Sequence, residues 1–286
     1  MSIITPQETN GYICFDEKAC AAAGAALAQQ YQAAGPFPHI VMDDFLPADF
    51  LRDLLAEFPE RGADQDSFDR DTERYKTQFP PRQIPGRRMR NLITELNSPA
   101  ILKFLEAMTG IKYLISDPYF TGGGLHETLP GGHLGVHADF NVHRLLNCER
   151  RLNLLIYLND DWSPDYGGQL ELWNKEMTRC EHRVEPLLGR AVVFNTALDS
   201  FHGHPDPLTC PPGRARRSIA TYYYTAPVDG IAAMTRRTTV FRQRAGSADK
   251  PDRKVQFDHF MRDWSPPKLY PIARRLNPWG LFARDK

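Results

Sequence analysis

The sequence predicts a mainly β protein with flanking helices, an α+β architecture whose core is a jelly roll. Roughly eight short strands separated by turns follow one another between residues 111 and 227. Helical apolar patterns dominate the first 110 residues. We therefore expect one structural domain in three parts: a helical support region over 1–110, a β core over 111–227 and a basic extension over 228–286.

The composition sets the broad class. The chain has 286 residues, of which 42% are hydrophobic and 24% charged, as in an ordinary globular protein. The formal net charge of zero argues against a general nucleic-acid or membrane binder. The charge is unevenly spread, because residues 228–286 carry 13 Lys or Arg and 6 Asp or Glu, a net charge of +7. A solvated surface and a partner-binding patch both fit this basic tail.

The cysteines indicate a reducing compartment. There are five, an odd number, and no two form a Cys-x-x-Cys pair, so the sequence predicts neither a disulfide framework nor a zinc knuckle. No basic segment followed by an apolar run opens the chain, and no run of 18 apolar residues occurs. We expect a cytoplasmic protein without a secretion signal or a membrane span.

Three helices are expected in the first part. Residues 17–35 are rich in Ala, Leu and Gln and end at Gly-Pro. After a short strand at 40–45, apolar residues recur at three- and four-residue steps over 48–58. A third helix begins at Ser98-Pro99 and ends at Thr109-Gly110.

Residues 60–90 lose this periodicity and are crowded with charge and proline. They predict a long loop, and a loop of this length in a compact domain is often a functional lid. We expect either a mobile lid over the mouth of an active site or a solvated surface. In the first case Arg87, Arg88 and Arg90 would meet an anionic or peptide substrate.

Strands dominate from residue 111. The run 111–120 ends at three glycines, and a further strand follows Pro130. Over 151–158 the even-numbered residues are apolar and should pack outside the barrel, whereas Asn153, Leu155 and Tyr157 should line it. Further strands are expected over 169–173, 191–194 and 218–225.

Beyond Pro227 the patterns weaken. Helical pieces are expected near 257–264 and 269–276. Trp279, Leu281 and Phe282 would pack on the protein's own core, or form a membrane-surface or dimer contact.

The chemistry concentrates in His137 and Asp139. Residues i and i+2 of a strand share a face, so this imidazole and this carboxylate should converge. His202 lies 63 residues after Asp139, and a folded sheet could bring it to the same point. Two His and one carboxylate on one face of a metal leave three positions open, the arrangement of non-haem Fe(II) oxygenases. His204 shares a face with His202 and stays open as the third ligand.

Arg216 begins the last β-favouring run. It shares a face with Ser218, Ala220 and Tyr222, so it can point inward while Arg217 points away. Arginine keeps its charge when buried and binds a carboxylate through two parallel hydrogen bonds.

Residues 129–225, about a third of the chain, resemble the catalytic domain of the 2-oxoglutarate- and Fe(II)-dependent dioxygenases, specifically the prolyl 4-hydroxylase-like branch. The resemblance implies a double-stranded β-helix. It implies that His137, Asp139 and His202 bind iron, and that Arg216 and Tyr157 bind the distal carboxylate of 2-oxoglutarate. Some members have a tyrosine before the Pro-Gly turn, where this chain has Leu129.

The implied reaction is hydroxylation of an aliphatic carbon by O2, with release of succinate and CO2 and with ascorbate as an optional reductant. Retention of Asp139 favours hydroxylation over halogenation. The leading substrate is a prolyl residue of a peptide or protein; a free amino acid or other small metabolite is the alternative. A third hypothesis is a non-catalytic metal-binding jelly roll, including a Zn(II) cupin, which would not need Arg216 with Tyr157.

Four further residues are candidates for contacts around the metal or with substrate: Asn153, His126, His133 and Arg88. We expect no nucleic-acid or membrane partner, and the oligomeric state stays open, with a homodimer among the options.

Overall fold

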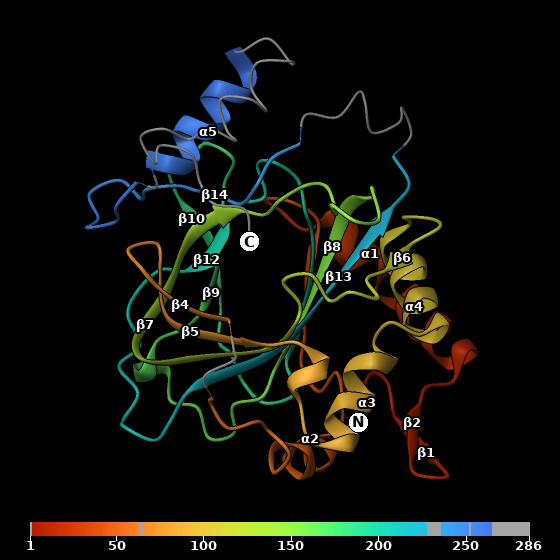
Figure 1. Cartoon of the computed structure of the whole chain (residues 1–286). Helices are drawn as coiled ribbons and strands as arrows, with labels where there is room; N and C mark the ends of the chain where they lie inside the picture. Colours follow the sequence, from red (N-terminus) through yellow and green to blue (C-terminus); the bar gives the residue numbers. More distant parts are fainter. Residues whose placement is uncertain (1, 63–65, 228–235, 252, 265–286) are drawn as a thin grey trace.

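The computed structural model describes residues 2–62, 66–227, 236–251 and 253–264 (Figure 1). The predicted helices are confirmed within a few residues at their ends. α1 and α4 lie side by side against the large sheet, and α2 and α3 lie close together nearby (Figure 1). The helices are α1 Glu17–Ala33, α2 Ala48–Leu55, α3 Arg87–Glu95, α4 Pro99–Thr109 and α5 Arg253–Trp264, with the short 3-10 turns η1 Pro81–Gln83 and η2 Pro164–Tyr166.

The ends of α1 and α4 follow from their sequences. The Asp16 side chain caps α1 by accepting a hydrogen bond from the Ala19 backbone N–H at 2.7 Å. Pro99 occupies the first turn of α4, and Gly110 ends that helix in the left-handed region at φ 76°. The two helices touch at Gly24, where a Cβ would lie 2.1 Å from the Phe104 carbonyl oxygen, so only glycine allows this packing.

The β core is a twelve-stranded sheet that folds round on itself, and a separate hairpin pairs β1 Gln7–Thr9 with β2 Tyr12–Cys14. The path of hydrogen-bonded neighbours runs β10-β9-β12-β7-β13-β8-β11-β3; β5 and β14 pair with β7, β4 with β5, and β6 with β13. The large sheet consists of β3 His39–Met42, β4 Asp66–Arg70, β5 Glu73–Phe79, β6 Ile115–Ser116, β7 Gly124–Ala138, β8 Glu149–Tyr157, β9 Leu170–Trp173, β10 Cys180–Val184, β11 Ala191–Asn195, β12 His202–His204, β13 Arg216–Thr225 and β14 Val240–Phe241.

The alternation expected in β8 is confirmed. Leu154 and Ile156 join the main apolar core with the helices. Tyr157 instead packs with Phe194 and Leu172, which come from strands elsewhere in the barrel. The apolar face of the sheet is thus covered by helices, and the other face encloses a more polar interior.

The prediction of a long loop over 60–90 is wrong. Residues 66–79 form the hairpin β4–β5, and β5 pairs along β7 from Leu134 to Leu125. The hairpin tip docks on β7, where the Gly135 N–H donates to the Thr72 carbonyl at 2.8 Å. The sequence concealed this strand because Glu73, Lys76 and Gln78 are buried polar residues, so no apolar alternation marks it.

Two other strand predictions need correction. Of residues 111–120 only β6 is a strand, since Tyr113 and Phe120 adopt left-handed backbone angles that interrupt pairing. β7 begins at Gly124 and runs through Pro130, rather than starting after it. The strands β1, β2, β10 and β14 were not expected, because β1, β2 and β14 have only two or three residues each and β10 is mostly polar.

In the extension, α5 confirms the helix expected near 257–264. The helix expected at 269–276, and Trp279, Leu281 and Phe282, lie outside the described residues. Among the helices that are described, none combines the length and apolar character required to cross a bilayer.

Candidate metal centre

Three predicted ligands converge at one end of the barrel. His137 lies near the end of β7, Asp139 follows that strand, and His202 begins β12, which pairs with β7 so that His202 is opposite His137. The potential ligand atoms of the three residues all lie within 4.8 Å of one another. The Nε2 atoms of His137 and His202 are 3.7 Å and 3.4 Å from the Asp139 carboxylate oxygens. This set fits one cation with an open face.

Both imidazoles are oriented for metal binding. Nδ1 of His137 lies 2.9 Å from the Gly135 carbonyl, and Nδ1 of His202 lies 3.0 Å from the Ser200 carbonyl. A carbonyl only accepts, so each Nδ1 carries the proton and each Nε2 keeps its lone pair. Burial lowers the pKa of His137, and burial together with the neighbouring His137 ring lowers the pKa of His202 to about 4. Neutral imidazoles are the form that binds a metal.

Asp139 is held in place by two neighbours. The Asn153 amide donates to its Oδ2 at 2.8 Å, and the Arg150 guanidinium lies 3.0 Å from the same oxygen. Burial acts to raise the pKa of Asp139, but Arg150, the two imidazoles and Asn153 outweigh it, so the pKa lies well below its ordinary value. The carboxylate is therefore ionised and fixed.

Arg150 is the residue near the metal group that sequence reasoning missed. It is 2% exposed, and its guanidinium lies 3.6 Å from the centre of the Tyr222 ring and 4.5 Å from that of Phe140. Simple alternation in β8 assigns an even-numbered residue to the outer face. The register of β8 with β13 shifts between Tyr223 and Tyr224, where β8 carries one extra residue, Arg151. Arg150 therefore turns to the face opposite the one that alternation assigns, and it reaches Asp139.

The other end of the barrel interior holds Arg216. Its Nε donates to the Gly168 carbonyl at 2.7 Å, and a terminal nitrogen lies 3.4 Å from the Tyr157 hydroxyl. Both side chains are buried, and burial lowers the pKa of Arg216 although Tyr157 opposes this. Among the described residues, Arg216 has no carboxylate partner. A buried guanidinium of this kind fits an anionic ligand.

The structure separates His204 from His202. His204 is opposite Leu134, its ring is 4% exposed, and it is not among the three residues whose ligand atoms converge. Its Nδ1 has no hydrogen-bond partner in the described part of the chain. The geometry therefore favours His202 as the third ligand.

The remaining candidates lie in different surroundings. Asn153 contacts Asp139, as described above, whereas Nε2 of His126 lies 3.0 Å from the Gly122 carbonyl inside the barrel. His133 points to the Asp71 carbonyl at 3.1 Å, in the hairpin tip. Arg88 lies on α3, where it pairs with Glu8 at 2.5 Å and covers the Phe50 ring, so the structure does not bring it to the metal group.

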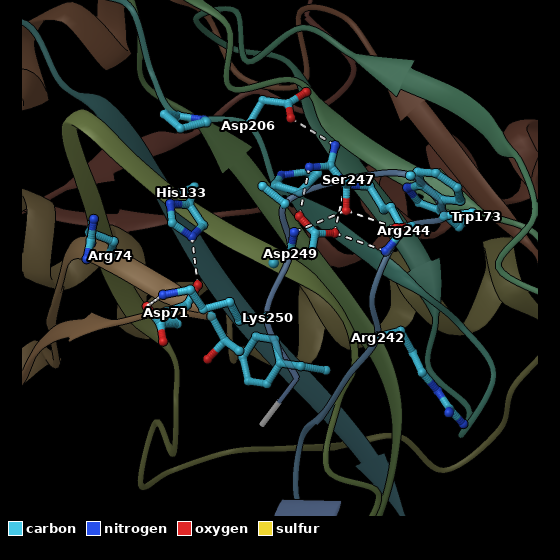
Figure 2. A pocket seen from close by; sticks show the side chains of 18 of the residues that line it. Asp71, Arg74, His133, Trp173, Asp206, Arg242, Arg244, Ser247, Asp249 and Lys250 are labelled. Atoms are coloured by element: carbon cyan, nitrogen blue, oxygen red, sulfur yellow. Dashed lines mark hydrogen bonds and ion pairs between the residues drawn. The ribbon is translucent and has the colours of Figure 1, made fainter. Parts of the chain in front are cut away.

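A pocket of about 620 Å³ lies between β7, β9 and residues 241–250 (Figure 2). None of the three converging ligands is among the described residues that line it. Its main cations are already paired: Arg244 contacts Asp249 and Asp206, and Lys250 contacts Asp71 (Figure 2). The three ligands thus lie outside the pocket, although Phe241 in its lining lies near the His137 ring, with 5.4 Å between the ring centres. Arg242, a third cation of the lining, lies over the Phe201 ring.

Comparison with known proteins agrees with this geometry. Residues 123–224, in the β core, match the family described as the 2OG-Fe(II) oxygenase superfamily, and this part of the chain belongs to that superfamily. With the triad of His137, Asp139 and His202, this membership makes Fe(II) the metal and 2-oxoglutarate the co-substrate. The protein is a 2-oxoglutarate- and Fe(II)-dependent oxygenase.

Two solved structures share the fold. A Pseudomonas putida prolyl-4-hydroxylase is 21% identical with a TM-score of 0.50, over 71% of this chain and 100% of that one. A Trichoplax adhaerens prolyl hydroxylase, in complex with a fragment of the hypoxia inducible factor oxygen degradation domain, is 17% identical with a TM-score of 0.51, over 72% and 91%. Such identities indicate a shared fold alone. No curated protein sequence matches the chain.

Proposed function

We propose that this oxygenase hydroxylates an unactivated aliphatic carbon of its prime substrate while 2-oxoglutarate is converted to succinate and CO2. The observation that carries the proposal is the combination of the metal triad with Arg216, a buried cation without a carboxylate partner among the described residues, in one barrel. A mere metal-binding module needs the first of these features only.

Each residue has a defined task in this proposal. His137, Asp139 and His202 hold Fe(II) through one face and leave three positions for ligands. Bound Fe(II) with the co-substrate supplies the activation of O2 that breaks an aliphatic C–H bond. Arg216 and Tyr157 bind the distal carboxylate and so set the orientation of the co-substrate. Asn153 and Arg150 keep Asp139 ionised and aimed at the metal.

A prolyl residue of a peptide or protein is the first substrate class to test, because both solved structures named above are described as prolyl hydroxylases. A free amino acid or another small metabolite is the second candidate. The specific observation in its favour is a buried pair of opposite charges on β5, described in the next subsection.

The test of hydroxylation is product analysis. Purified protein with Fe(II), 2-oxoglutarate, O2 and ascorbate is offered proline-containing peptides and free amino acids in parallel, and succinate is quantified. We expect succinate to rise with one class, together with a product heavier by one oxygen atom. Succinate that forms without any oxidised substrate across both classes would contradict the proposal.

A further inference from the structure

The hairpin β4–β5 contributes a buried ion pair to the barrel. Lys76 Nζ lies 2.8 Å from Glu73 Oε1, and the two side chains are 11% and 8% exposed. Burial acts to raise the pKa of Glu73, but Lys76 outweighs it, so this pKa is lowered and the carboxylate stays ionised. Taking two charges out of water is costly, and such pairs seldom stabilise a fold. The pair therefore calls for a functional explanation.

The pairing register shows that Lys76 faces the barrel interior. Lys76 is opposite Thr128 on β7, and Thr128 is opposite Arg216 on β13. Directly opposed residues of antiparallel strands point to the same face of a sheet, so Lys76 and Arg216 face the same interior.

Glu73 reaches the same interior from the metal side. It is opposite Leu134, which is in turn opposite His204. Burial is the main cause of the pKa shifts of His137 and Tyr222, and the negative charge of Glu73 acts on both. The register thus places Glu73 across β7 from the strand of His202 and His204, and Lys76 across β7 from Arg216.

The ion pair retains hydrogen-bonding capacity. An ammonium has three N–H donors, and Lys76 uses one of them on Glu73, while the Phe68 ring lies 5.2 Å from its nitrogen. The second oxygen of Glu73 has one weak contact, to Arg70 at 3.4 Å. Both members can accept a further polar partner without losing each other.

Building on the proposed function, we propose that Glu73 and Lys76 bind the head group of the prime substrate, and that this substrate is a free α-amino acid. Lys76 binds the α-carboxylate and Glu73 binds the α-ammonium. An α-amino acid carries both charges on one carbon, so it complements two opposite charges that are already adjacent.

Charge balance separates this role from binding of the co-substrate. Arg216 is a cation without an anionic partner among the described residues, so it matches a lone carboxylate. Glu73 and Lys76 together have no net charge, so they match a zwitterion, which has none either. A prolyl residue inside a peptide is flanked by neutral amides and offers neither charge, which would leave the buried pair without a ligand.

The experiment uses the full chain loaded with Fe(II) without oxygen. A visible charge-transfer band on addition of 2-oxoglutarate first establishes the co-substrate site, independently of this inference. Each of the twenty free L-amino acids is then added, alongside its N-acetylated and C-amidated form, and the change in the band is titrated. The variants are Lys76→Met and the double change Glu73→Gln with Lys76→Met, in which neither charge is left buried alone. Arg74→Met, on the exposed face of the same strand, is the control.

We expect at least one free amino acid to perturb the wild-type band and its blocked form not to. In both variants the binding of that amino acid should be weaker by about tenfold or more, as for loss of a charged contact. The 2-oxoglutarate titration should be unchanged. Equal binding of blocked and free forms, or a band that no free amino acid perturbs, would overturn the inference. So would a weakened 2-oxoglutarate titration in Lys76→Met, which would assign the pair to the co-substrate. Absence of the band in wild type would instead overturn the proposed function.

Discussion

At the scale of single residues, the state of the metal group is set by groups that do not bind the metal. Asp139 stays ionised because Arg150 and Asn153 hold one of its oxygens. The two imidazoles stay neutral because their rings are buried, and the carbonyl oxygens beside their Nδ1 atoms fix the proton on those atoms. The site is therefore ready to accept a cation without a large change in protonation.

Replacement of Arg150 by Met tests whether Arg150 keeps Asp139 ionised and in place for the metal. It removes the cation beside Asp139 while keeping an apolar stem between Tyr222 and Phe140. We expect the affinity for Fe(II) to fall by about 10- to 100-fold, as for other groups that orient metal ligands. Metal titration measures it. Arg151→Met, which alters a partly exposed neighbour that pairs with Glu149, should have little effect; equal losses in both variants would contradict this role.

A second residue-scale prediction concerns pH. The pKa of His202 is about 4 in the folded protein and 6.5 without its surroundings, so the unfolded chain binds more protons between these values. Stability of the metal-free protein is then present above about pH 6.5 and falls as pH drops towards 4, by about 2 to 3 kcal/mol from this group. Urea unfolding at a series of pH values should show a shallower dependence in His202→Gln. An unchanged slope would argue against a buried neutral imidazole.

At the scale of elements, the contact between α1 and α4 depends on one missing side chain. Because Gly24 has no side chain, the Phe104 carbonyl lies where it would clash with a Cβ. Gly24→Ala should gain helix propensity but lose this packing, for a net destabilisation of about 1 to 3 kcal/mol. Thermal unfolding would measure it, with the exposed Ala25→Leu as a control on the same helix. Stabilisation by Gly24→Ala would show that the helices separate readily.

Elements also show where sequence reasoning succeeds. The apolar alternation of β8 and the periodicity of α2 and α4 reflect burial on one face, so both were predictable. The hairpin β4–β5 was not predictable in this way. The charged side chains of Glu73 and Lys76 are buried, so the strand has no apolar alternation. Arg150 was missed for a related reason, since the extra residue Arg151 in β8 moves Arg150 off the face that alternation assigns.

At the scale of the whole molecule, the sheet brings together residues that are far apart in sequence. His202 pairs with His137 across β12 and β7, and Arg216 enters the same barrel from β13. The order of these residues along the chain allowed the metal set to be predicted. It could not separate His202 from His204, because both lie on the short strand β12 and only the folded register distinguishes them.

The most direct test of the central claim is anaerobic titration of the Fe(II)-loaded protein with 2-oxoglutarate, followed by visible absorption. The account predicts a charge-transfer band that saturates in the wild type. Arg216→Ala should raise the half-saturating concentration by about 10- to 100-fold, through loss of a buried charged contact, and His202→Ala should abolish the band. A folded, iron-loaded protein without a band, or with a band unaffected by both changes, would contradict it.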